Sequence, residues 1–425
     1  MTRRVAVIGG GWAGCAAALT LAQAGCRVSV FEAADRLGGR ARTVTLDDRE
    51  LDNGQHILSG AYTQTLDLIA RVGVDSAALL QLPFALDCPG EFTVRCPRLP
   101  APWHLVAGLA AARGFSLREK AAALRWAGKA LGGAPPAARQ TAAEWLAGQP
   151  QRLRERLWEP LCIAALNTPP ARASAASLHA VLVASLSGRR ANSDLILPRV
   201  NLGALFPAPA ARRIAELGGS VHLRTRVRAL TAARDGVTVV TATAAMPFDH
   251  AIIAVAPQHL KPLVRAIAAL DATVATVGAL AFEPIATAYL QYPPGTRLDR
   301  PMLALAGQPA QFVFDRGQTH GQDGLFAAVA SAASALIGQS RTAWLDAIER
   351  QLTRVARLPR PSWRRGVIEK QATWSCRPGI VRPGTRTAHA RVFLAGDYLH
   401  GAYPATLESA TLAGVQSAQA LLEAS

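Results

Sequence analysis

A glycine-rich turn near the N-terminus constrains the fold of this chain more than any other feature. Gly9, Gly11 and Gly14 follow a short apolar segment and open an alanine-rich one. This spacing is typical of the turn from a strand into a helix in a doubly wound α/β sheet, because the glycines allow a tight turn, close approach of a pyrophosphate and close helix–strand packing. The helix N-terminus would supply free N–H groups to the phosphates. The sequence therefore predicts a dinucleotide site.

An acidic residue at the end of the second predicted strand indicates which dinucleotides fit. Glu32 directly follows the strand-like residues 28–31 and lies 18 positions beyond Gly14. A carboxylate at this place binds the ribose hydroxyls and repels a 2′-phosphate. The sequence therefore disfavours NADP.

Further motifs extend the cofactor site to both ends of the chain. Residues 36–43 read Arg-Leu-Gly-Gly-Arg-Ala-Arg-Thr, where two glycines permit close backbone approach and the arginines offer rigid cationic groups. Residues 392–397 read Val-Phe-Leu-Ala-Gly-Asp, and residues 404–410 are expected to open a helix. A helix N-terminus there would supply N–H groups to the electron-rich end of a flavin. These motifs predict that the dinucleotide is FAD.

Together these motifs resemble those of the FAD-dependent amine oxidase and phytoene desaturase superfamily. The resemblance implies an α/β fold, in which a Rossmann-like FAD-binding domain of the GR2 type is interleaved with a mixed α+β, largely helical substrate domain. It also implies that Val227 contacts the adenine through its backbone and that Asp397 contacts the ribityl chain. The residues expected at FAD are Gly9, Gly11, Trp12, Ala13, Gly14, Glu32, Ala33, Arg40, Gly54, Gln55, Val227, Gly396, Asp397, Thr406 and Leu407.

A narrower resemblance rests on three segments. Residues 51–62, residues 158–168, and residues 396–398 with 404–410 are similar to the squalene-associated desaturases of hopanoid synthesis, the hydroxysqualene dehydroxylases. The second segment lies in the variable substrate domain, so it is the most telling of the three. The resemblance implies reduction of hydroxysqualene to squalene by reduced FAD, with a long isoprenoid as substrate and an electron donor that the sequence does not identify. Residues 398–403 are family-variable, so their chemistry cannot be transferred.

Four residues are candidates for catalysis. An allylic alcohol loses hydroxide poorly, so the site needs an acid beside the flavin and apolar surroundings. His56 and Asp52 occur in a loop that passes the flavin ring in this superfamily, while Tyr398 and His400 come from the opposite wall. Plainer roles stay open for the first two, since Asp52 could cap the turn at residues 53–54 and His56 could hydrogen-bond a carbonyl.

Three other functions compete with this interpretation. A phytoene or carotenoid desaturase would run the flavin in the oxidising direction, which the sequence alone does not exclude. An amine oxidase is less favoured, because aromatic residues are few and no cysteine lies where the family forms a covalent flavin bond. A prenyl-lipid escort protein would keep this fold without chemistry, but the intact glycine and arginine motifs argue against it.

The pattern along the chain predicts interleaved domains. Residues 1–75, 206–265 and 376–425 are expected to form the FAD-binding domain. Residues 76–205, which are rich in Pro, Ala and Trp, and residues 266–375 are expected to form the substrate domain. Residues 221–230 alternate between apolar and basic side chains, which predicts one continuous strand with one face in solvent.

Two capping boxes predict helix starts in the substrate domain, Ser116 with Glu119 and Thr141 with Glu144. The first of these helices combines an apolar stripe with basic residues. Such a helix can lie on a membrane surface, but we favour the interpretation that the stripe faces the core. The stripe consists of Leu117, Ala121, Leu124 and Leu131.

The charge of the chain favours an anionic partner. The formal net charge is +17 and comes mostly from arginine, although an arginine-rich genome would explain this equally well. No helix-turn-helix, zinc-finger or aromatic RNA-binding pattern occurs, so nucleic acid is not expected and an anionic membrane surface is the better candidate. The six cysteines lack metal-ligand spacing, and no metal site is expected.

The sequence also predicts a location. No apolar run is long enough to cross a bilayer, and the N-terminus runs directly into the first strand without an export signal. We therefore expect a cytoplasmic protein, either free or peripheral on the inner face of the cytoplasmic membrane.

Overall fold

A parallel sheet carries the glycine-rich turn. The computed structural model describes residues 2–401 and 403–424. Its first sheet has the strand order β10–β2–β1–β14–β20, with parallel pairing throughout. Strands from distant parts of the chain thus meet in one sheet, which confirms the predicted Rossmann-like α/β fold. They are β1 (Arg4–Ile8), β2 (Arg27–Phe31), β10 (Ser220–His222), β14 (His250–Ile253) and β20 (Val392–Leu394).

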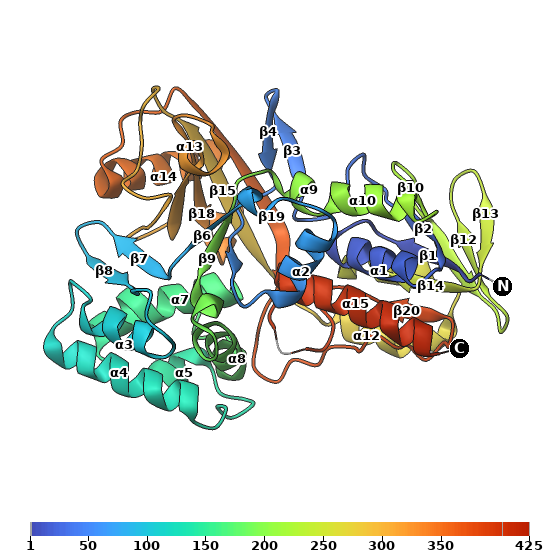
Figure 1. Ribbon diagram of the computed structural model, residues 1–425, viewed down its shortest axis with the longest axis horizontal. Coiled ribbons are helices and arrows are strands. Elements are labelled where there is room, and N and C mark those ends of the chain that lie inside the picture. The colour runs from blue at the N-terminus through green and yellow to red at the C-terminus, as the bar shows by residue number, and fades with distance from the viewer. Residues whose placement is uncertain (1, 402, 425) are drawn as a thin grey trace.

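The first and last long helices pack against each other beside this sheet (Figure 1). They are α1 (Trp12–Gln23) and α15 (Leu407–Glu423), while α10 (Pro207–Glu216) and α2 (Thr63–Arg71) pack against α1 and α15 respectively. A Cβ on Gly414 of α15 would overlap the carbonyl of Ala13, so the two backbones approach closely there. The C-terminal helix is therefore part of the dinucleotide-binding unit.

A second, antiparallel sheet forms the core of the substrate side. Its order is β16–β17–β18–β15–β19, and α14 (Arg341–Ala356) packs on β19 with the ring of Trp344 over Gly366. Buried apolar side chains of the sheet and α14 form one cluster. The strands are β15 (Phe282–Gln291), β16 (Met302–Ala304), β17 (Phe312–Asp315), β18 (Leu325–Ala330) and β19 (Trp363–Trp374).

A helical layer completes the substrate side and occupies the end of the molecule away from both termini (Figure 1). Both predicted capping boxes are present, at the N-termini of α4 and α5. The predicted core stripe of α4 is wrong, because Leu117 and Ala121 are exposed and the helix buries Ala123 and Ala130 instead. The helices are α3 (Trp103–Ala110), α4 (Leu117–Gly132), α5 (Ala142–Leu146), α7 (Glu159–Leu166) and α8 (Ala175–Leu186).

Shorter elements connect these layers. The strands are β3 (Thr43–Leu46) paired with β4 (Arg49–Asp52), β5 (Leu58–Ser59) and β6 (Leu79–Leu82) on either side of β9 (Leu195–Pro198), β7 (Ala85–Cys88) paired with β8 (Phe92–Arg95), and the three-stranded sheet of β11 (Ala229–Ala232), β12 (Val237–Val240) and β13 (Ala245–Phe248). The helices are α6 (Gln151–Leu153), α9 (Leu202–Leu205), α11 (Leu260–Val264), α12 (Asp271–Gly278) and α13 (Arg316–His320).

The single strand expected at residues 221–230 is wrong. β10 ends at His222, Arg224 takes a positive φ of 52°, and β11 begins in a different sheet. The backbone N–H groups of Arg224 and Thr225 donate to Ala34 O and Glu32 O. These bonds turn the segment across the end of β2, which alternation of apolar and basic side chains could not reveal.

The expected domain boundaries remain a prediction. All strands of the parallel sheet lie within residues 1–75, 206–265 and 376–425, and all strands of the antiparallel sheet lie within 266–375. Pairing of β5 with β9 crosses the expected boundary, however, and joins residue 58 to residue 196.

Within the described part of the chain, no helix combines the length and apolar character that crossing a membrane requires.

Candidate active site

Two backbone groups hold the carboxylate of Glu32 at the end of β2. Gly10 N donates to Glu32 Oε2 (2.7 Å), and Ala34 N donates to Oε1 (2.8 Å). A carboxylate oxygen accepts more than one hydrogen bond, so both oxygens keep capacity for ribose hydroxyls. Val227 lies in the segment that crosses this end of β2, near the place where the sequence predicts the adenine.

The arginine motif at residues 36–43 lies directly against the glycine turn. Gly38 N donates to Gly10 O (2.8 Å). A Cβ built on Gly11 would meet only ordinary van der Waals contact beside this bond, since the nearest atom outside its immediate neighbours is Gly39 Cα at 3.8 Å. The backbone thus leaves room at the position where the sequence predicts a pyrophosphate.

An ion pair joins the arginine motif to the C-terminal strand. Arg40 Nη2 lies 2.5 Å from Asp397 Oδ1, and Arg40 Nη1 donates to Ala372 O (2.7 Å). Trp374 Nε1 donates to Asp397 O (2.9 Å). The carboxylate of Asp397 is nearly buried, so this contact fixes residues 40 and 397 relative to each other in a partly desolvated setting.

The N-terminus of α15 follows this pair along the chain, and the helix begins within residues 404–410 as expected. Thr406 and Ser409 form a capping box. The buried carboxylate of Glu408 accepts hydrogen bonds from Gln64 N (2.9 Å) and Thr65 N (2.8 Å), the first turn of α2. The sequence did not predict that Glu408 caps α2. The only local sign was an acidic residue in the first turn of a helix, and such residues are also common on exposed helices.

The loop that contains His56 connects the arginine motif to the antiparallel sheet. Asn53 Nδ2 donates to Arg40 O (3.0 Å), and Gly54, with a φ of +132°, lies beside Thr287 of β15. His56 Nδ1 lies 2.8 Å from Gly54 O. A carbonyl only accepts, so Nδ1 carries a proton and Nε2 of the neutral ring is free to accept one. The plainer role considered for His56, a bond to a carbonyl, is therefore present.

Burial sets the charge of His56. It lowers the pKa of the imidazole below its ordinary value of 6.5, the bond to Gly54 O opposes this, and the nearby Arg40 guanidinium lowers the pKa further. His56 is therefore neutral at neutral pH and becomes an acid only after taking up a proton.

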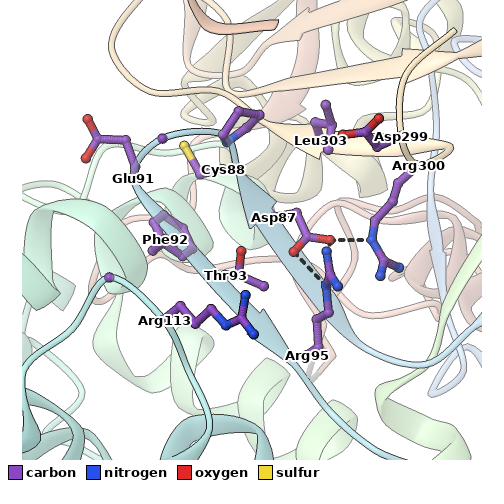
Figure 2. Close-up of a pocket in the computed structure, with 13 residues that line it drawn as sticks. Asp87, Cys88, Glu91, Phe92, Thr93, Arg95, Arg113, Asp299, Arg300 and Leu303 are labelled. Atoms are coloured by element: carbon purple, nitrogen blue, oxygen red, sulfur yellow. Dashed lines mark hydrogen bonds and ion pairs between the residues drawn. The ribbon is translucent and has the colours of Figure 1, made fainter.

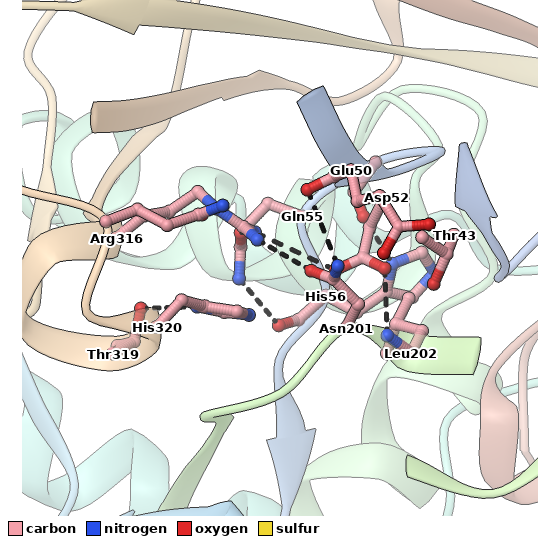
Figure 3. A network of polar contacts seen from close by, with 12 residues as sticks. Thr43, Glu50, Asp52, Gln55, His56, Asn201, Leu202, Arg316, Thr319 and His320 are labelled. Carbon is pink, nitrogen blue, oxygen red and sulfur yellow. Dashed lines mark hydrogen bonds and ion pairs between the residues drawn. The ribbon is translucent and has the colours of Figure 1, made fainter. Parts of the chain in front are cut away.

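Asp52 is engaged with a buried arginine that the sequence analysis did not find (Figure 3). Its carboxylate accepts from Leu202 N (2.8 Å) at the start of α9 and lies 3.7 Å from Arg316 Nη1, while Tyr289 OH donates to its carbonyl (2.9 Å). Asp52 therefore caps α9, and not the turn at residues 53–54. The guanidinium also donates to three amide oxygens, those of Gln55 (2.8 Å), Asn201 (2.9 Å) and Gln322 (2.6 Å).

The charged groups of this polar centre, Arg316 and Asp52, are buried. Burial raises the pKa of Asp52 to about 6, although Arg316 and the bond from Leu202 N oppose the shift. Burial, reinforced by Arg316, lowers the pKa of His320 to about 3, so this imidazole is neutral beside the guanidinium. The centre ties the loop at residues 52–56 to α9 and α13, which brings three distant segments together.

The two candidates from the opposite wall occupy different environments. Tyr398 is buried with its ring against Gly396, and its hydroxyl has no partner among the described residues. Burial raises the pKa of this hydroxyl, so it stays protonated. His400 is exposed, and its backbone N–H donates to Pro383 O (2.8 Å). The structure thus brings Tyr398, but not His400, into a buried setting.

The segment at residues 158–168 acts as a connector in the substrate side. Asn167 ends α7 with a φ of 45°, and its Nδ2 donates to Thr373 Oγ1 (2.9 Å) while its Oδ1 accepts from Ala332 N (2.6 Å). Thr168 Oγ1 accepts from Cys376 N (2.9 Å). The segment therefore links the helical layer to β19 and to the chain that leads toward β20.

Two surface hollows lie away from all of these groups. The hollow in Figure 2, of about 340 Å³, is formed by the β7–β8 hairpin and residues 299–303. Asp87 in its wall pairs with Arg95 (2.9 Å) and Arg300 (2.6 Å). The second hollow adjoins it and includes residues 354–357. Neither contains a residue expected at FAD, and the charged wall of the first does not suit an isoprenoid chain.

The donor set fits FAD. Glu32 supplies oriented acceptors, Gly11 leaves space for the pyrophosphate, and Arg40 lies beside Asp397 at the expected flavin end. Beside this site, the buried hydroxyls of Tyr398 and Thr287 have no hydrogen-bond partner among the described residues. They can therefore form hydrogen bonds with a ligand. Trp12 and Ala13 are buried in α1, so only their backbone N–H groups suit a phosphate.

Comparison with known proteins agrees with this geometry. The chain matches hydroxysqualene dehydroxylase of Sinorhizobium fredii at 26% identity over 450 residues, covering 99% of each chain. It matches hydroxysqualene dehydroxylase of Rhodopseudomonas palustris at 27% identity over 455 residues, covering 100% of this chain and 99% of the relative. The match with zeta-carotene desaturase of Synechocystis is 37% identical but covers only 16% of this chain and 14% of that one.

Solved structures share the fold. A putrescine oxidase variant superimposes with a TM-score of 0.74 at 18% identity, covering 100% of this chain and 99% of that one. A protoporphyrinogen oxidase homologue from Exiguobacterium gives a TM-score of 0.71 at 16% identity, with coverage of 100% and 99%. The family of flavin containing amine oxidoreductases matches residues 12–422. The chain belongs to this family and is an FAD-dependent oxidoreductase.

Proposed function

We propose that this protein reduces hydroxysqualene to squalene, replacing an allylic hydroxyl by hydrogen. Similarity along the whole chain to two hydroxysqualene dehydroxylases carries the proposal. The similarity to the carotenoid enzyme is confined to about a sixth of the chain, so it supports the shared cofactor more than a shared substrate. An escort role is not favoured, because the chain belongs to the flavin containing amine oxidoreductases and keeps Glu32, Arg40 and Asp397, which suit FAD.

The reaction needs a hydride, a proton and protection from water. When bound and reduced, FAD would supply the hydride for the allylic carbon, and the hydroxyl would leave as water after taking up a proton. The chain must supply that proton at the leaving oxygen and must hold the isoprenoid in apolar surroundings. The electron donor that restores reduced FAD stays unassigned.

We assign the proton to His56. Its Nδ1 is fixed by Gly54 O, so its Nε2 is the nitrogen that takes up and delivers a proton. The buried Tyr398 hydroxyl is a second donor available to the leaving oxygen or to FAD. Asp52 acts through Arg316 by fixing the loop that carries His56, since its carboxylate is already engaged. The exposed position of His400 supports no role in proton transfer.

A single-turnover experiment tests the proposal. The purified protein should be yellow, and its flavin should bleach when reduced with dithionite under anaerobic conditions. Addition of hydroxysqualene should then restore the oxidised flavin spectrum, whereas squalene should not. A reduced enzyme that stays bleached with hydroxysqualene would contradict the proposal without affecting the assignment of FAD.

Replacing His56 should separate chemistry from cofactor binding. We expect His56→Ala to retain FAD, because the bond to Gly54 O is local, but to slow flavin reoxidation at least about tenfold. Stopped-flow absorbance with hydroxysqualene measures the rate, and the flavin-to-protein ratio measures retention. The exposed His400 provides a matched control, and His400→Ala should react at the wild-type rate. Unchanged turnover in His56→Ala would remove this residue from the mechanism.

The pH dependence should follow protonation of the same imidazole. Because burial holds the pKa of His56 below 6.5, the acid form grows as pH falls. The rate of flavin reoxidation should therefore rise toward low pH and level off below that pKa. In His56→Ala this rise should be absent. A wild-type rate that falls steadily through the same range would contradict a proton supplied by His56.

A further inference from the structure

An exposed apolar surface marks the outer end of the helical layer. Among the described residues, four of the seven exposed large hydrophobic side chains lie between residues 99 and 117. Trp103 is 63% exposed and Leu117 is 83% exposed. Clustered exposed apolar side chains indicate an interaction site, whereas single ones are ordinary. The four are Leu99, Trp103, Val106 and Leu117, and they are called the α3 patch below.

The packing of α3 holds this surface outward. On its inner face, His104 Nε2 lies 3.0 Å from Ser193 Oγ, and a Cβ on Gly108 would lie 2.7 Å from Cys96 Sγ. Residues four apart share one face of a helix, so these contacts fix the inner face. Trp103 and Val106 are three apart and lie on the opposite, exposed face. The exposure is therefore built into the packing, and α3 itself carries no Asp, Glu, Lys or Arg.

The first turn of α4 continues the surface with positive charge. Lys120 Nζ donates to Ala110 O (3.0 Å), which places the start of α4 against the end of α3. Leu117 lies one turn before Lys120, and Arg118 and Arg125 are exposed on the same helix. Both helices lie at the end of the molecule remote from the termini (Figure 1).

The surroundings of the patch are strongly basic. Residues 97–140 contain seven Arg and Lys residues and a single acid, Glu119. That carboxylate is occupied by the capping box, where it accepts from Ser116 N (2.7 Å) and Ser116 Oγ (2.8 Å). The basic side chains near the patch therefore lack acidic partners within this segment.

Apolar side chains with an indole, bordered by Arg and Lys, match the chemistry of an anionic bilayer surface. The indole and aliphatic groups enter the boundary between headgroups and acyl chains, while the cations face the lipid phosphates. We propose that the α3 patch and the basic side of α4 dock this protein on an anionic phospholipid membrane. In this arrangement α3 supplies the apolar anchor and α4 supplies the positive charge. It differs from an amphipathic helix, which carries both an apolar stripe and the basic residues itself. The proposal does not depend on the identity of the substrate.

Vesicle co-sedimentation of the full-length, FAD-loaded protein tests this docking. Wild-type protein should bind vesicles that mix phosphatidylglycerol with phosphatidylcholine, bind phosphatidylcholine alone much more weakly, and be released by high salt. Trp103→Glu should weaken binding at least about tenfold, because it replaces the exposed indole of the apolar anchor by a negative charge. The double change Arg118→Gln with Arg125→Gln should weaken binding to the anionic vesicles and leave the weak neutral binding unchanged.

Matched controls lie elsewhere on the surface. Ile337→Glu changes another exposed aliphatic side chain, and Arg341→Gln with Arg350→Gln removes two exposed charges from α14. These controls should bind like wild type, and all variants should retain flavin absorbance and thermal midpoint. Equal binding of Trp103→Glu and wild type would overturn the proposal, as would equal binding to neutral vesicles. A dimer in solution that Trp103→Glu disrupts, without vesicle binding, would overturn it in favour of a second copy of this chain.

Discussion

Replacing Arg316 by methionine should destabilise the protein by about 3–5 kcal/mol, the range for removing one partner of a buried ion pair. The guanidinium is fully buried and lies 3.7 Å from the Asp52 carboxylate. Arg316→Met would leave that carboxylate buried without its cation and would orphan the amide oxygens of Gln55, Asn201 and Gln322. The free energy of unfolding from urea titration, measured without FAD, gives the effect. Arg341→Met on the exposed start of α14 is the matched control and should change stability by less than about 0.5 kcal/mol.

The stability deficit of Arg316→Met should shrink as pH falls from neutrality. In the wild type the pKa of Asp52 is about 6, which is above that of an exposed aspartate. Folding therefore favours the protonated carboxyl. The stability that this protonation contributes is full below the unfolded pKa and is lost as pH rises through 6. Without the cation this pKa rises further, and the variant then regains stability over a wider pH range on acidification. Loss of Arg316 also raises the pKa of the neighbouring His320, which acts in the same direction. A deficit below about 1 kcal/mol, or one that grows on acidification, would contradict a buried charge pair.

Adding one methyl group at Gly11 should weaken FAD binding by roughly 10- to 100-fold, because the side chain would occupy the space left for the pyrophosphate. The FAD-free protein should tolerate the change. Gly11 has a φ of −72° and a ψ of 178°, which alanine adopts without strain, and a Cβ there meets nothing closer than 3.8 Å. Titration of the apoprotein with FAD, followed by flavin fluorescence, gives the affinity. The thermal midpoint of the apoprotein should match that of the wild type.

Gly9→Ala provides the contrasting variant. Gly9 has a φ of +107°, and a Cβ there would lie 2.5 Å from Ala254 O, so alanine should destabilise the apoprotein itself. The two substitutions in one motif should thus have different effects, with Gly11→Ala weakening FAD binding and Gly9→Ala destabilising the fold. If Gly11→Ala bound FAD like the wild type, the pyrophosphate would have to lie elsewhere.

The sequence predicted those parts of the fold and site that depend on local geometry. The capping boxes of α4 and α5 join residues three apart, and the glycine turn and Glu32 belong to a single strand–helix–strand unit with a fixed spacing. Each of these elements has the expected form. The strand expected at residues 221–230 failed because its backbone bonds to residues 32 and 34, just past the end of β2 and nearly two hundred residues away along the chain. The apolar stripe of α4 failed because the helix contacts its neighbours through small residues, Ala123 and Ala130.

The loop at residues 52–56 shows the same limit. Sequence reasoning found Asp52 and His56, but not Arg316, whose contacts with Asp52 and Asn201 span more than a hundred residues. An arginine in a chain with many arginines carries no local sign that it is buried. Charged residues pack in the interior only when partners from other segments meet them, and that meeting is a property of the folded chain.

Product analysis tests the central claim most directly. Protein carrying FAD reduced by dithionite should convert hydroxysqualene to squalene under anaerobic conditions, with one squalene formed for each FAD oxidised. Protein carrying oxidised FAD should leave phytoene unchanged. Formation of squalene in this ratio is the result that we predict. Absence of squalene, with desaturation of phytoene by the oxidised enzyme, would contradict a hydroxysqualene dehydroxylase. It would indicate instead that the flavin oxidises the substrate.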